Sequence, residues 1–67
     1  MTLEESIDTL REEIQVLDPT GRQQVEPLLD ARDGLRIVAA LEQHERSGAL
    51  TSPRFRQALE ALYWSSR

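Results

Sequence analysis

The sequence predicts an all-α fold: a small bundle of three helices, or a fold like a helical hairpin, in a single domain of residues 1–67. Apolar residues recur at helical spacing in three stretches, and capping or stop residues separate these stretches. No stretch alternates apolar and polar residues for long enough to indicate a strand. We expect helices at about residues 2–17, 23–46 and 53–65, with neighbours antiparallel because their connections are short.

The first predicted helix carries the strongest periodic signal. Thr2 and Glu5 have the spacing of a capping box, so a helix is expected to begin there. A short heptad seam follows, made of Leu3, Ile7, Leu10, Ile14 and Leu17. Isoleucine at the a positions with leucine at the d positions is typical of parallel two-stranded coiled coils. The seam either forms a subunit interface or packs on the chain's own later helices. We favour the interface, and a dimeric state, because so short a domain buries little surface alone.

The second predicted helix has a less regular sequence. The Asp-Pro-Thr-Gly stretch at residues 18–21 ends the first helix, although Asp18 and Pro19 could equally cap and open the next one. Apolar residues then follow a helical repeat from residue 23 to residue 46, interrupted by Pro27 and Gly34. We interpret this stretch as one helix that is bent or broken near Gly34, since glycine in a helix interior costs about 1 kcal/mol relative to alanine.

The third predicted helix begins after a clear stop. Gly48 ends the preceding helix, and Ser52 with Pro53 supplies a cap followed by proline at the first helical position. An amphipathic face follows, made of Phe55, Ala58, Leu59, Leu62 and Tyr63. Trp64 lies beside this face. Large rings on a final helical turn either mark an interface or fold back over the end of the domain.

The expected core combines one face from each helix. Its predicted members are Leu3, Ile7, Leu10, Ile14, Leu17, Leu28, Leu35, Val38, Leu41, Phe55, Leu59 and Leu62.

Composition restricts the class of protein. The chain has 67 residues, a net charge of −4 and no cysteine, and its acidic residues gather in the first third while arginines gather in the last. We expect the acidic and basic ends to neutralise each other, within one chain or between chains. Charged residues interrupt the N-terminal stretch, so no signal-peptide core or membrane span is predicted, and a cytoplasmic location is expected.

No catalytic, cofactor-binding or metal-binding residue is predicted. His44 is the single histidine, and no nucleophile pattern accompanies it, so we expect it only to interact with the end of its helix. The carboxylates Glu5, Asp8 and Glu12 share one flank of the first helix, which is typical of a solvated face.

Two segments resemble parts of the all-helical chorismate mutases: residues 28–38, with Leu-Leu-Asp-Ala-Arg, and residues 46–54, with Arg-Ser-Gly-Ala-Leu. The resemblance implies a basic catalytic pocket that uses lysine as well as arginine. Lysine is absent here, and Pro19, Gly21 and Pro27 interrupt the segment that would match a long first helix. We therefore do not assign the chain to that family.

The predicted function is that of a non-enzymatic helical protein–protein interaction module: an assembly factor, an adaptor or an inhibitor. Its predicted interface residues are Leu3, Ile7, Leu10, Ile14, Leu17, Phe55, Leu59, Leu62, Tyr63 and Trp64. The expected partner is protein, in a homodimer or a hetero-oligomer, with no cofactor and no membrane. Two alternatives are a regulator that binds nucleic acid through Arg46, Arg54, Arg56 and Arg67, and an acidic inhibitor that occupies a basic groove of its target. The acidic composition disfavours the nucleic-acid alternative.

Overall fold

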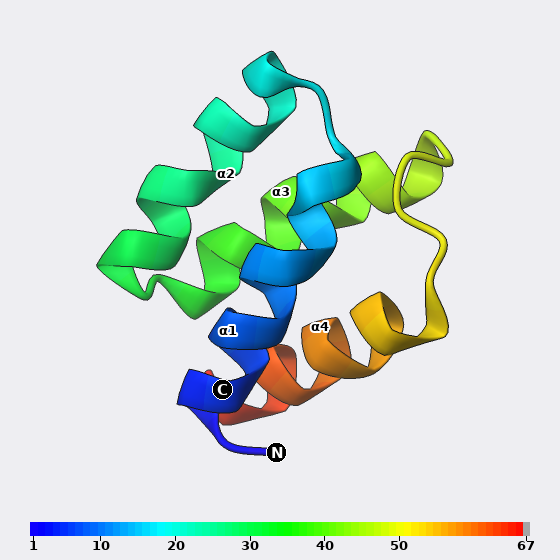
Figure 1. Ribbon diagram of the computed structural model, residues 1–67. Coiled ribbons are helices and arrows are strands. Elements are labelled where there is room, and N and C mark those ends of the chain that lie inside the picture. The colour runs from blue at the N-terminus through cyan, green and yellow to red at the C-terminus, as the bar shows by residue number, and fades with distance from the viewer. Residues whose placement is uncertain (67) are drawn as a thin grey trace.

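The protein is all-helical in its computed structural model, which describes residues 1–66 (Figure 1). The elements in chain order are α1 (Leu3–Glu13), the 3₁₀ turn η1 (Ile14–Val16), α2 (Pro19–Ala31), α3 (Gly34–Arg46) and α4 (Pro53–Ser65). The all-α prediction is confirmed, but there are four α-helices in this part of the chain where three were predicted.

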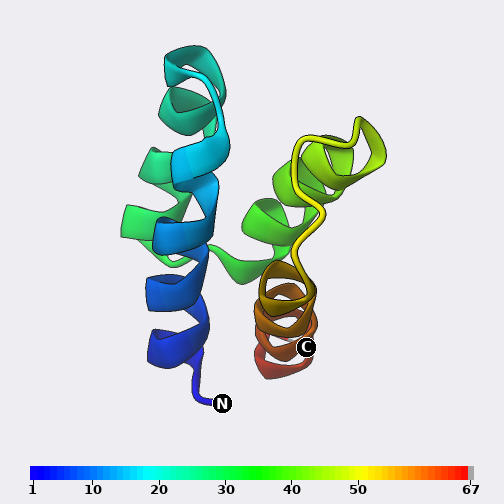
Figure 2. The same ribbon diagram turned by 45° about the vertical axis from the view of Figure 1, so that its right-hand side comes forward.

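Each helix packs on its neighbour in the chain, and α4 returns to pack on α1, so the four helices surround one core. Figure 2 separates α1 and α2 in one layer from α3 and α4 in the other. The start of α4 meets the end of α1, because Arg54 pairs with Glu12. It also meets the end of α3, because Arg56 pairs with Glu45. Helix α4 is therefore antiparallel to both.

The predicted capping box opens α1. The Thr2 hydroxyl oxygen accepts a hydrogen bond from the Glu5 backbone N–H, and the Glu5 carboxylate accepts one from the Thr2 N–H, both at 3.2 Å. The α-helical winding ends at Glu13 and tightens into η1, after which Leu17 is extended. The helical stretch thus ends close to the predicted boundary.

Helix α2 begins four residues before its predicted start. Asp18 caps it, accepting a hydrogen bond of 2.7 Å from the Gly21 N–H, and Pro19 takes the first helical position. Of the two roles open to the Asp18–Pro19 pair, the structure shows the opening of α2. Pro27 lies inside this helix, on an exposed position, where solvent can hydrate the carbonyl that proline leaves without a donor.

Residues 23–46 do not form one continuous helix, because the chain breaks between α2 and α3, next to Gly34, where a bend or break was expected. Arg32 adopts the left-handed conformation with φ of 57°. The N–H groups of Arg32 and Asp33 donate to Leu29 and Leu28, which is the hydrogen-bond pattern of a Schellman motif. Asp33 then caps α3 by accepting from the Arg36 N–H. Gly34 is the first residue of α3 and lies after the break.

The core contains most of the predicted residues and several others. Its buried apolar members are Ile7, Leu10, Ile14, Leu17, Val25, Leu29, Ile37, Val38, Leu41, Leu50, Phe55, Ala58, Leu59 and Leu62. Leu3 and Leu28 are partly buried against it. The prediction for Leu35 is wrong, since its side chain is 55% exposed. Helix α3 turns Ile37, Val38 and Leu41 inward, and this register leaves Leu35 on the outer side.

Within residues 1–66, no helix has the length and apolar character needed to cross a membrane.

Candidate interaction surface

The heptad seam of α1 lies in the core of its own chain. Ile7, Leu10, Ile14 and Leu17 are buried, and Leu3 packs at the edge of the same cluster. Helix α4 provides most of the cover, because it runs antiparallel along α1. The structure therefore shows the seam in intramolecular packing. Self-association through the seam stays a prediction, and it would require helices to exchange between copies.

The predicted interface residues of α4 divide between two faces. Phe55, Leu59 and Leu62 are buried, whereas Tyr63 is 36% and Trp64 66% exposed. The two exposed rings contact each other edge to face, with centroids 5.5 Å apart and planes at 74°. Of the ten predicted interface residues, these two are the ones whose large side chains reach the surface of the single chain.

The exposure of Trp64 follows from the register of α4. Phe55, Ala58, Leu59 and Leu62 form the inward face at helical spacing. Trp64 is two residues after Leu62, about 200° further around the helix, so it is directed away from the core. Its position on the outer face is therefore set by the same packing that buries the rest of the helix.

The aromatic residues lie at one end of the molecule. Helix α1 begins and α4 ends at the lower edge of the views in Figures 1 and 2. Met1, which is also largely exposed, lies at that end because it precedes α1. We call the surface formed by Met1, Tyr63 and Trp64 the aromatic end. Val16 is exposed as well, but it follows α1 and lies away from this surface.

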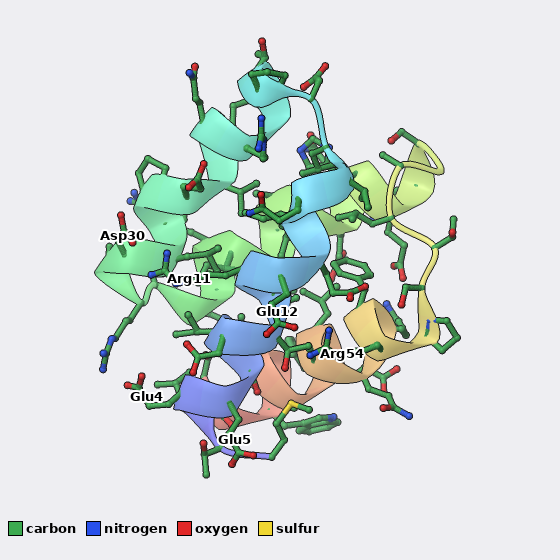
Figure 3. All side chains as sticks on the ribbon, viewed as in Figure 1. Glu4, Glu5, Arg11, Glu12, Asp30 and Arg54 are labelled. Carbon is green, nitrogen blue, oxygen red and sulfur yellow. The ribbon has the colours of Figure 1, made fainter. Side chains whose placement is uncertain are left out.

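The basic tail is paired with carboxylates of the same chain. Arg54 lies 2.6 Å from a Glu12 carboxylate oxygen and 3.3 Å from one of Glu13 (Figure 3). Hydrogen bonding to Glu12, with the attraction of both carboxylates, raises the pKa of Arg54 further above its usual range. Arg56 lies 2.9 Å from Glu45. Arg54 thus joins the basic and acidic ends within one chain, whereas Arg56 pairs with carboxylates of α3 and α4.

The other two arginines of the nucleic-acid alternative are Arg46 and Arg67. Arg46 lies 3.6 Å from Glu42, one turn earlier on α3. Arg67 lies outside the described residues. Since each of the described tail arginines faces a carboxylate, none of them forms part of an uncompensated basic patch.

The groups considered for chemistry belong to two different helices, since His44 lies on α3 and the three carboxylates lie on α1. His44 is half-buried in the last turn of α3, where an added Cβ on Gly21 would lie 3.4 Å from its ring. Glu5, Asp8 and Glu12 are exposed on α1. Residues 1–66 enclose no pocket and contain no group of three side chains placed to hold a metal ion.

The fold and this surface together define a small four-helix domain with an exposed aromatic end. No family model, curated protein or solved structure matches the chain.

Proposed function

We propose that the protein is a non-enzymatic interaction module, acting as an assembly factor, adaptor or inhibitor, and that it binds another polypeptide through its aromatic end. The observation that carries this proposal is the 66% exposure of Trp64, the one tryptophan of the chain. Tryptophan and tyrosine are enriched among the residues that dominate binding energy at protein interfaces.

The packing of the chain supports this choice of surface. The apolar residues of α1 and the inner face of α4 are covered, so they already contribute to the stability of the fold. Burying a large apolar side chain is worth about 1.5–3 kcal/mol. About two thirds of the Trp64 side chain is exposed, so a partner that covers it can gain much of that contribution on binding.

Charge favours a polypeptide partner over nucleic acid. Binding to a phosphate backbone relies on arginine or lysine side chains that are free to displace counterions. The described arginines of the tail face carboxylates of their own chain instead. A nucleic acid would first have to displace these ion pairs.

The proposal is tested by measuring how a Trp64→Ala variant binds. Proteins captured by the immobilised full chain from its host would be purified, and the affinity of each would be measured by calorimetry. We expect Trp64→Ala to weaken the binding of a true partner by about tenfold or more, as for a hot-spot residue. The matched control is Val16→Ala, which shortens an exposed apolar side chain away from the aromatic end.

Both variants should keep the helical circular dichroism and the thermal stability of the parent chain, because both side chains are exposed. Partners that bind the Trp64→Ala variant as tightly as the parent chain would contradict the proposed function.

A further inference from the structure

The ion pairs of the fold leave an excess of negative charge on the surface. Within residues 1–66, every arginine except Arg22 forms an ion pair with a carboxylate of the same chain. Four carboxylates in this range have no arginine partner: Glu5, Asp8, Asp18 and Glu26. Asp18 is engaged as the cap of α2, and Glu5 belongs to the capping box of α1 and lies near the positively charged N-terminal amino group. The charge left over for an outside partner is therefore mainly acidic.

Two of these carboxylates lie at the aromatic end. Glu5 and Asp8 belong to the first two turns of α1, which is antiparallel to α4, so they lie beside the turn where α4 ends. Glu5 is seven residues before Glu12, nearly two full turns, and hence lies on the same flank of α1. That flank is directed toward α4, because Glu12 contacts Arg54 (Figure 3).

Resting on the function proposed above, we propose that the aromatic end binds a basic amphipathic segment of a partner protein. An apolar side chain of that segment packs on Tyr63 and Trp64, and its lysine or arginine side chains lie beside Glu5 and Asp8. A cation next to an indole face adds a further attraction, which strengthens as the site loses water. Opposite charges at the rim of an apolar contact favour association and select the partner.

A second copy of the chain suits this surface less well. A symmetric dimer through the aromatic end would use the same patch on both copies. Each Glu5 and Asp8 would then face the acidic rim of the other copy, and like charges placed together oppose binding. The net charge of −4 on each chain adds to this repulsion.

The test uses the fluorescence of Trp64, which is the single tryptophan and therefore reports on the aromatic end alone. The full chain is titrated with a synthetic amphipathic peptide of leucine and lysine, and separately with a peptide in which glutamate replaces lysine. We expect the leucine–lysine peptide to shift the emission to shorter wavelength in a saturable way. Affinity should fall as salt is added. The leucine–glutamate peptide should leave the emission unchanged.

Charge variants locate the binding site. Glu5→Gln keeps an acceptor for the Thr2 N–H, so the capping box is preserved. We expect Glu5→Gln and Asp8→Asn each to weaken binding of the leucine–lysine peptide by about two- to fivefold, as for an exposed ion pair. Glu26→Gln removes the same charge from α2, which packs mainly on α3 and α1, and should leave the affinity unchanged.

Several outcomes would overturn the inference. Equal loss of affinity in Glu5→Gln and Glu26→Gln would mean that only net charge attracts the peptide. An equal shift with the leucine–glutamate peptide would reject a basic partner while leaving the proposed docking at Trp64 in place. A shift that depends on protein concentration without any peptide would assign the surface to a second copy. If the leucine–lysine peptide caused no shift, the inference of a basic partner would also be wrong. The proposed interaction function would still be tested separately, by the binding of Trp64→Ala to a purified partner.

Discussion

Gly34, the first residue of α3, lies directly against Ser66 at the end of α4. A Cβ atom added to Gly34 would stand 2.7 Å from the Cβ of Ser66, closer than such atoms approach in proteins. The contact fixes the last turn of α4 against the first turn of α3. It therefore positions the turn that carries Tyr63 and Trp64.

Replacing Gly34 by alanine should destabilise the fold, although alanine is the better helix former. Overpacking costs about 1–3 kcal/mol, whereas the helix preference of alanine over glycine is worth at most about 1 kcal/mol. We expect a net loss in the free energy of unfolding, measured by urea titration. Adding Ser66→Gly removes the opposing side chain and should restore most of the loss. A Gly34→Ala variant more stable than the parent would show that Ser66 moves aside freely.

At Arg32, by contrast, a substitution by glycine should stabilise the fold. Its φ of 57° places an L-residue in the left-handed region, which glycine occupies without a steric cost. Relief of the left-handed strain is worth about 1–2 kcal/mol, and the greater freedom of glycine in the unfolded chain takes back about 0.4–1 kcal/mol. Arg32→Gly should therefore raise the free energy of unfolding by up to about 1 kcal/mol, even though it removes the exposed ion pair with Glu4. Arg32→Ala keeps the strain and loses the pair, so it should be no more stable than the parent. Urea titrations of the three proteins would reveal the order, and an alanine variant equal to the glycine variant would contradict this account.

Ile14 tests whether the seam stabilises the single chain. It is fully buried, so Ile14→Ala should lower the free energy of unfolding by about 2–5 kcal/mol. If the seam packs intramolecularly, as in the structure, the loss is the same at every protein concentration. A loss that grows on dilution, together with a change in sedimentation, would instead place Ile14 at a subunit interface.

The capping box predicts a dependence of stability on pH. The hydrogen bonds from the Thr2 backbone N–H and hydroxyl lower the pKa of Glu5 below its ordinary value. A carboxylate whose pKa is lower in the folded state stabilises the fold above its unfolded pKa, and this contribution is lost as pH falls through the folded pKa. Stability should therefore fall below about pH 4.3, the ordinary value for glutamate.

The matched control is Glu5→Gln, which cannot titrate. Its free energy of unfolding should vary less with pH between about pH 5 and pH 3 than that of the parent. Parallel pH profiles of the two proteins would contradict the assignment to Glu5. Because Glu5 is fully exposed, the measurement is best made at low salt, where screening is weak.

The features predicted correctly are those that depend on a few adjacent residues. The Thr2–Glu5 capping box, the start of α4 after Ser52 and the burial of Ile7, Leu10 and Ile14 each follow from local spacing. Local spacing did not decide the role of Asp18, because the Asp18–Pro19 pair could either end the first helix or open the next one. In the structure Asp18 caps α2.

The sequence indicated a bend or break near Gly34 but did not decide between them, because arginine rather than glycine occupies the left-handed position. Glycine is the usual signal for that conformation, so the sequence alone offered no reason to end a helix at Arg32. The error at Leu35 has the same origin. With one continuous helix, the sequence did not determine which side of the helix Leu35 would occupy. A helix that begins at Gly34 turns Ile37 and Leu41 toward the core and leaves Leu35 exposed.

The candidate surface could be predicted only in part. Tyr63 and Trp64 were singled out from their place on a final turn, and they are exposed. The pairing of Arg54 with Glu12 joins residues from opposite ends of the chain, and no local pattern specifies which carboxylate an arginine will meet. The charge gradient predicted neutralisation but not its partners, and these partners determine which carboxylates are left at the aromatic end.

The connection between α3 and α4 lies at the far end of α4 from Trp64, and it carries the exposed residue Ala49. Because the chain contains no cysteine, an Ala49→Cys variant would have a single thiol. A dye or a solid support coupled there would leave the aromatic end facing the solution. A label at the start of α1 or at the end of α4 would instead crowd it, since these two helix ends lie together (Figure 1).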